Sequence, residues 1–325
     1  MATTTTPDVR PAALPPAAGR AGLRGALASE FTKLRSVRST YWTLGALFFV
    51  SVGLGIAIAA GTAANFTDHP FQKIAFDATQ TSLGAFFELG QLIIAVIGAM
   101  VITSEYSTGM IRTSLTAQPR RGVVYAAKAI AFTAVTLVIS VVTSFVAFLA
   151  GQAMYASSLV GASLFHAVKI PANGNVTCQQ RVPAGPGAPP GAFTCAPGKR
   201  VVTVTAWDVI HPSTVLAAII GTALFVTIVA LISFGVGAII RHTAGTIATV
   251  IALMFILPLL ENTLPTDWHN DIMRFLPDAA NQVVSVTIGP TSQNLWSAWP
   301  QLGVTALWAA ALVGIGAYLF RKRDA

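Results

Sequence analysis

The stretch ITSEYSTGMIRTSLTAQPRRGVVYAAKAI, residues 102–130, decides the fold because it joins two long apolar runs through a short polar segment. A glycine at position 109 interrupts the first run. After this break, Met110, Ile111 and Leu115 recur at the spacing of one helix face. The pattern predicts a short surface helix between the two apolar runs.

Charged residues stand on both sides of this short helix. Glu105 ends the first apolar run, and Pro119 with Arg120 and Arg121 begins the second. Lys128 follows one to two turns later, where its long side chain is expected to reach back to the lipid headgroups. The order of acid, helix and basic cluster predicts a segment at a membrane surface.

The composition is that of a membrane protein, with 54% hydrophobic residues, only 10% charged residues and a mean hydropathy of +0.68. A hydrocarbon core about 30 Å thick needs roughly 20 apolar residues in a helix. Six segments approach or exceed this length, and they are residues 41–60, 83–103, 123–151, 215–240, 243–260 and 301–320. We therefore predict an all-α membrane protein with six transmembrane helices, the fifth interrupted by Pro258.

Six spans place both termini on one side of the membrane, and the basic residues indicate which side. Fourteen of the 20 lysines and arginines fall in the tails or in the second-to-third and fourth-to-fifth loops. This bias predicts a multi-pass protein of the cell membrane with cytoplasmic N- and C-termini. It also accounts for the net charge of +8, and no zinc spacing or aromatic–basic interleaving predicts a nucleic-acid partner.

This topology divides the chain into one large domain with two tails. Residues 1–22 are rich in Thr, Pro and Ala and are expected to form a disordered cytoplasmic tail. Residues 23–320 form the six-span domain, and residues 321–325 form a basic cytoplasmic tail. Residues 154–212 form an extracellular insert between the third and fourth spans.

Cys178 and Cys195 both fall in this extracellular insert. A disulfide persists on that side of the membrane, so we predict a bridge between them, with two free thiols as the alternative. The flanking residues 175–182 and 200–205 are then expected to pair as a small hairpin.

Before the first span, residues 23–38 show the pattern of an amphipathic helix. Leu23, Leu27, Phe31 and Leu34 follow one another at i, i+4, i+8 and i+11. This stripe predicts an interfacial helix in the cytoplasmic headgroup layer. A membrane anchor and a docking surface for a cytoplasmic partner are both compatible with it.

The span centres are almost free of ionisable groups, and Glu88 is the main exception. It lies about five residues from the outer start of the second span, with Gln91 one turn further. Buried charges in membranes are costly and usually functional, which favours a polar contact with substrate or with a second protomer. The alternative is a carboxylate that reaches back to the interface.

The chain lacks the motifs of an enzyme. No G-x-x-x-x-G-K-[ST] phosphate loop is present, so we expect no ATP site and no bound cofactor in this chain. Asp267 and Asp271 share a helix face that His269 does not join, so no metal site is predicted. No nucleophile and base converge in the sequence.

The segment first described resembles the same loop in permease subunits of type-2 ATP-binding-cassette (ABC) transporters of the bacterial exporter kind. The matching positions are Glu105, Gly109, Leu115, Pro119, Arg120, Arg121 and Lys128. The resemblance extends to the amphipathic helix, the six spans and the basic C-terminus. The insert at residues 154–212 is longer than in many relatives.

The resemblance implies a permease subunit of an ATP-driven exporter, paired with a second copy or a paralogue and moved by a separate ATPase that binds ATP and Mg²⁺. It implies that the ATPase contacts Glu105, Gly109, Met110, Ile111 and Leu115, and that Arg120 and Arg121 steady this contact. A non-transporting sensor or scaffold remains an alternative because of the large insert. An ion-gradient-driven transporter is another, although mid-membrane charges are scarce.

Overall fold

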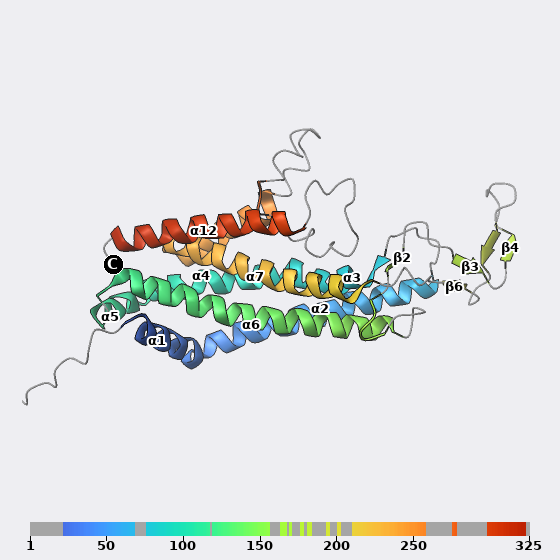
Figure 1. Ribbon diagram of the computed structural model, residues 1–325, viewed down its shortest axis with the longest axis horizontal. Helices are drawn as coiled ribbons and strands as arrows, with labels where there is room; N and C mark the ends of the chain where they lie inside the picture. The colour runs from blue at the N-terminus through green and yellow to red at the C-terminus, as the bar shows by residue number, and fades with distance from the viewer. Residues whose placement is uncertain are drawn as a thin grey trace, which may run out of the picture.

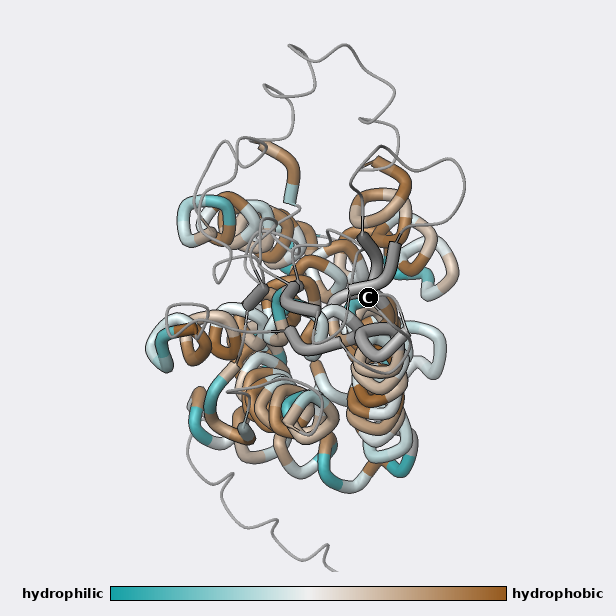
Figure 2. The backbone as a smooth tube through the Cα atoms, turned by 90° about the vertical axis from the view of Figure 1, so that its right-hand side faces the viewer, coloured by the Kyte–Doolittle hydropathy of each residue, from teal (hydrophilic) through white to brown (hydrophobic). Residues whose placement is uncertain are grey.

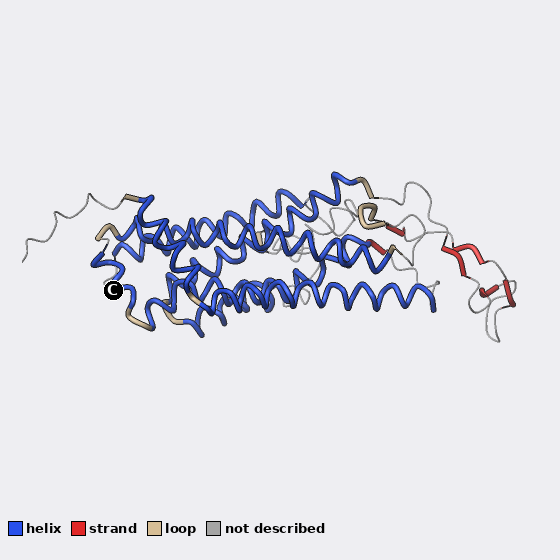
Figure 3. The backbone as a smooth tube through the Cα atoms, turned by 90° about the horizontal axis from the view of Figure 1, so that it is seen from below, coloured by secondary structure: helices blue, strands red, loops and turns tan. Residues whose placement is uncertain are grey.

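The computed structural model describes residues 22–68, 76–117, 119–156, 163–167, 169–170, 176–178, 181–183, 193–195, 200–202, 210–257, 275–277 and 298–322. These residues form an elongated helical bundle with short strands beyond one end (Figures 1 and 3). The opposite end carries α5 and the end of the last helix, and we call it the α5 end.

The helices take up nearly all of the bundle. In chain order they are α1 (Leu23–Ser36), α2 (Arg38–Asp68), α3 (Ala78–Ala85), the π-helix η1 (Phe86–Gly90), α4 (Gln91–Ser107), α5 (Met110–Ala117), α6 (Arg121–Tyr155), α7 (Pro212–Ile240), α8 (Thr243–Ile251), the π-helix η3 (Ala252–Ile256) and α12 (Ala298–Lys322). Hydrophobic residues dominate the long helices, as the hydropathy colouring in Figure 2 shows. This apolar surface suits a bilayer, in which a helix satisfies its own backbone groups.

Helix α7 forms the centre of the bundle. Its most apolar window is 67% buried, against 22% for the windows in α2 and α12, and it packs on α4, α6 and α12. Small residues allow this close packing. A Cβ added at Gly98 would lie 2.6 Å from the Ala230 carbonyl oxygen, and one added at Gly235 would lie 2.7 Å from the Leu312 carbonyl carbon. Close backbone approach at glycines is a common means of helix association in membranes.

The second predicted span, residues 83–103, lies within a longer helical stretch. Helices α3, η1 and α4 follow one another directly, and Asp77 caps the stretch by accepting hydrogen bonds from the Thr79 and Gln80 amides at 2.8 and 3.1 Å. The π-turn at Phe86–Gly90 interrupts the α-helical pattern within this segment.

The number of candidate spans is smaller than the six predicted. Four helices are long and apolar enough to cross a membrane, and a fifth qualifies if α4 and α5, which meet at 79°, count as one broken span. The apolar helix Thr243–Ile256 is shorter, and Pro258 lies outside the described residues. The structure thus confirms an all-helical membrane-type bundle with four or five candidate spans, while six spans stay a prediction.

Short strands pair within the insert and at its base. β1 (Phe76–Asp77) pairs with β2 (Lys169–Ile170), β3 (Val176–Cys178) with β6 (Arg200–Val202), and β4 (Arg181–Pro183) with β5 (Phe193–Cys195), all antiparallel. The pairing of β3 with β6 confirms the core of the predicted hairpin.

Several other predictions fall outside the described part of the structure. They concern the tail at residues 1–21, the side chains of the two cysteines, and Asp267, His269 and Asp271. The disulfide therefore stays a prediction.

Candidate functional site

The site begins at the break between α4 and α5, where the chain turns sharply. Gly109 has a φ of +71°, a conformation that glycine adopts without the steric penalty of other residues. The turn is closed by the Gly109 amide, which donates to the Tyr106 carbonyl at 3.3 Å. The glycine break predicted from the sequence is confirmed, and its role is to aim α5 across the end of α4.

Helix α5 divides its apolar residues between the bundle and the outside. Ile111 is 3% exposed within the core, and Leu115 packs against that core, whereas Met110 is 49% exposed. Arg112 and Thr113 are also exposed. Ile111 therefore holds α5 on the bundle, and Met110 marks the face that a partner can reach.

Helix α1 turns its polar side toward the bundle, where it packs on α6. Among its residues, Ala26 and Glu30 are buried. The predicted apolar stripe faces outward in part, since Leu23 and Phe31 are 43% and 53% exposed. This exposed stripe is what an interfacial helix would present to lipid, and that role stays a prediction.

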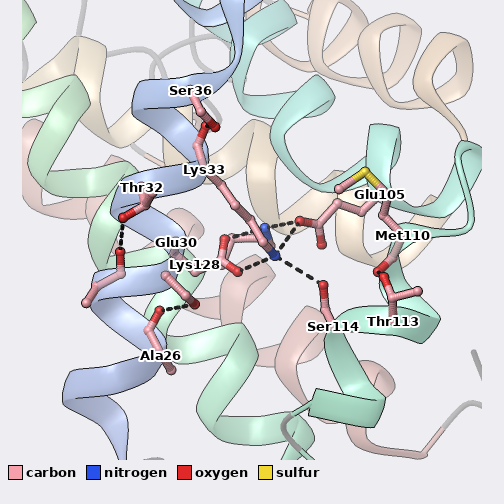
Figure 4. A network of polar contacts seen from close by, with 12 residues as sticks. Ala26, Glu30, Thr32, Lys33, Ser36, Glu105, Met110, Thr113, Ser114 and Lys128 are labelled. Atoms are coloured by element: carbon pink, nitrogen blue, oxygen red, sulfur yellow. Dashed lines mark hydrogen bonds and ion pairs between the residues drawn. The ribbon is translucent and has the colours of Figure 1, made fainter.

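Four charged side chains from three helices meet beneath α1, and we call Glu30, Lys33, Glu105 and Lys128 the ion-pair network (Figure 4). Lys128 Nζ lies 2.6 Å from Glu30 Oε2 and 2.7 Å from Glu105 Oε1. Lys33 Nζ lies 2.9 Å from Glu30 Oε1 and 3.4 Å from Glu105 Oε1. Each carboxylate thus binds both ammonium groups, so α1, α4 and α6 are tied together.

The ion-pair network is largely withdrawn from water. The side chains of Glu30, Glu105 and Lys128 are 5%, 9% and 7% exposed, and that of Lys33 is 33% exposed. Two carboxylates and two ammonium groups balance in charge. Removing one member of such a buried set leaves an uncompensated charge, at a typical cost of about 3–5 kcal/mol.

The pKa values on α1 follow from this arrangement. Burial alone would raise the pKa of Glu30, but the attraction and hydrogen bond of Lys128, with those of Lys33, lower it below its ordinary 4.5. Burial alone would lower the pKa of Lys33, but its hydrogen bond to Glu30 and the charges of Glu105 and Glu30 raise it above 10.5. The two groups remain charged throughout the neutral range.

The ion-pair network also reaches α5. Lys33 Nζ donates a hydrogen bond to Ser114 Oγ at 3.1 Å (Figure 4). A displacement of α5 therefore acts on α1 directly, and on α6 through the shared carboxylates.

The prediction for Lys128 was wrong. Its ammonium group does not reach back to the headgroups but is buried between two carboxylates, because their charges offset the desolvation that a lone ammonium would suffer. Glu30 was missed altogether. The available signal was its position on the polar side of the amphipathic helix, three residues before a lysine.

The remaining predicted site residues lie elsewhere. Arg120 is exposed at the start of α6, and Arg121 begins that helix partly buried. Gln91 is buried at the start of α4, some 21 Å along the helix from Glu105 at about 1.5 Å per residue. Glu88 belongs to η1, and its side chain lies outside the described part of the structure.

Comparison with known proteins gives one family. Residues 26–178 match the family model described as ABC-2 family transporter protein. A comparison with curated protein sequences gave no match. The matched region contains α1, the α4–α5 turn and the whole ion-pair network. The family is a membrane component of ABC transporters, is not itself an ATPase, and normally works with an ATP-binding-cassette partner. The match and the apolar helices together identify this multi-pass membrane protein as a permease of the type-2 ABC transporter family.

Proposed function

We propose that this chain is the permease subunit of an ATP-driven exporter and that a separate ATPase moves it through α5. The observation that supports the proposal is the ion-pair network, which links α1 and α6 to the end of α4 just before the α5 turn. The ATPase would bind ATP and Mg²⁺, and this chain would hold no cofactor.

The proposed movement starts at the exposed face of α5. Met110 offers an apolar contact and Arg112 a charged one. A push on this face reaches Lys33 through Ser114, and reaches the core through Ile111. Because separating the buried charges is costly, α1 and the adjoining ends of α4 and α6 move together rather than one by one.

The proposal includes six spans with cytoplasmic termini and a second permease, either a copy or a paralogue. The bias of lysine and arginine toward the α5 end supports the orientation. In this arrangement α5 lies in the cytoplasm, where an ATPase is available.

The ion-pair network argues against the ion-gradient alternative. Among the described residues, the buried charged side chains lie at helix ends, in the ion-pair network and at the Asp77 cap. A proton- or ion-coupled carrier usually holds such groups in mid-membrane. The sensor alternative shares the architecture and differs in transporting nothing.

The test is ATP hydrolysis by the complex of this chain with its ATPase in proteoliposomes. We expect Lys128→Met to reduce the stimulation of hydrolysis by at least about tenfold, since α6 then loses both carboxylates of the ion-pair network. Arg35→Gln, which changes an exposed charge on α1, is the matched control. Equal stimulation by the Lys128 variant and the control would refute the coupling role.

A further inference from the structure

A cavity of about 360 Å³ lies between α1, α2, α4 and α6. The ion-pair network lines one part of it, and apolar side chains that include Val101, Phe132 and Val135 line much of the rest. Its volume falls in the range of about 300–1,000 Å³ that is usual for small-molecule sites. It combines an apolar wall with charged groups that the coupling proposal leaves incompletely used.

One buried polar atom of this wall lacks a partner. Glu105 Oε1 lies beside both ammonium groups, but Glu105 Oε2 is buried without a hydrogen-bond partner among the described residues. Glu105 as a whole is 7% exposed. A buried carboxylate oxygen without a donor is unfavourable, so the site favours a ligand that brings one.

The hydroxyl groups of the cavity also offer acceptors rather than donors. Thr136 donates its proton to the Phe132 carbonyl at 2.9 Å, Thr108 to the Ser104 carbonyl at 2.7 Å and Ser36 to the Lys33 carbonyl at 3.1 Å. Their lone pairs remain for a ligand. The Lys33 ammonium has three N–H groups and contacts three oxygens, those of Glu30, Glu105 and Ser114.

The shape of the cavity suits an elongated ligand. On α6 its wall runs from Lys128 to Thr136, and on α4 from Ile97 to Glu105 and beyond. Eight residues of helix measure about 12 Å. An apolar chain of that length fits between α4 and α6, with its head at the ion-pair network.

We propose that this cavity binds a cationic amphiphile with a primary ammonium head on Glu105 Oε2 and its apolar tail between α4 and α6. A primary ammonium carries three donors and no acceptor, which matches a site whose free polar groups are acceptors. Its contact with the carboxylate is charge-assisted and therefore stronger than that of a neutral head. The binding does not depend on coupling to an ATPase.

The test uses the purified full chain and a photoreactive long-chain alkylamine with its reactive group in the tail. We expect saturable labelling of α4 and α6 around Val101 and Val135. Dodecylamine should compete at least about tenfold better than dodecanol or dodecyl sulfate, because only the ammonium donates charge-assisted bonds. Equal competition by dodecanol or dodecyl sulfate would overturn the cationic head.

Two variants keep the result independent of the ion-pair network. Val101→Trp fills the cavity and should abolish the labelling, whereas Val138→Trp, at a 62% exposed position on α6, should leave it intact. Thr136→Val removes an acceptor at similar volume and should weaken binding about three- to tenfold. Labelling spread over exposed helix faces and unchanged by Val101→Trp would refute the site.

Discussion

At the scale of single residues, Glu105 connects the two roles inferred for the α5 end. One carboxylate oxygen lies beside Lys33 and Lys128, and the other borders the cavity without a protein donor. The sequence predicts the importance of Glu105 from its position before the glycine break. It does not reveal the partners, because Glu30 lies 75 residues away and the contact requires α1 to fold back on α6.

Lys128→Met should destabilise the folded chain. Two buried carboxylates would then share the single ammonium of Lys33, and we expect the free energy of unfolding in detergent to fall by about 3–5 kcal/mol. Adding Glu105→Gln to the same chain restores the charge balance and should recover part of this loss. Losses that simply add in the double variant would show that the two residues do not interact.

The attachment of α1 should depend on pH at both extremes. The folded-state pKa of Glu30 is below 4.5, so its contribution is complete above pH 4.5 and disappears as the pH falls through the lower folded value. The folded-state pKa of Lys33 is above 10.5, so its contribution is complete below pH 10.5 and disappears as the pH rises through the higher folded value.

Hydrogen exchange of the α1 amides, corrected for the intrinsic effect of pH, measures this attachment. Protection should be flat across the neutral range and should fall in acid below about pH 4.5. A steep change of protection near pH 7 would mean that other groups hold α1.

At the scale of helices, the sequence predicts the long apolar elements well and the interrupted ones poorly. Helices α6 and α7 match predicted spans because one uninterrupted apolar run defines each. The π-turn η1 and the short helix Thr243–Ile256 depend on packing against neighbouring helices, which a hydropathy pattern does not contain.

Gly98 sets the distance between α4 and α7. Gly98→Ala would place a Cβ 2.6 Å from the Ala230 carbonyl oxygen, so the backbones must separate, at a cost of about 1–3 kcal/mol. Gly303→Ala is the matched control, since no atom lies within 4 Å of its added Cβ. Thermal unfolding in detergent should show a lower Tm for the first variant and an equal or higher Tm for the second. Equal melting of the two would contradict the packing argument.

At the scale of the whole molecule, the account requires the α5 end to face the cytoplasm. Thr116 on α5 and Leu164 near the insert are exposed at opposite ends of the bundle. With both native cysteines replaced by serine, Leu164→Cys should react with an impermeant maleimide in intact cells. Thr116→Cys should react only in inverted vesicles. The reverse pattern would invert the proposed topology.

The central claim is that an ATPase acts on α5, and affinity purification of the tagged chain in mild detergent tests it most directly. We expect an ATP-binding-cassette ATPase to co-purify, and Met110→Asp to reduce its yield at least about tenfold by placing a charge on the apolar contact. Leu164→Asp, at the opposite end, should leave the yield unchanged. A folded chain that brings down no such ATPase, or a Met110 variant that retains as much of it as the Leu164 control, would contradict the account.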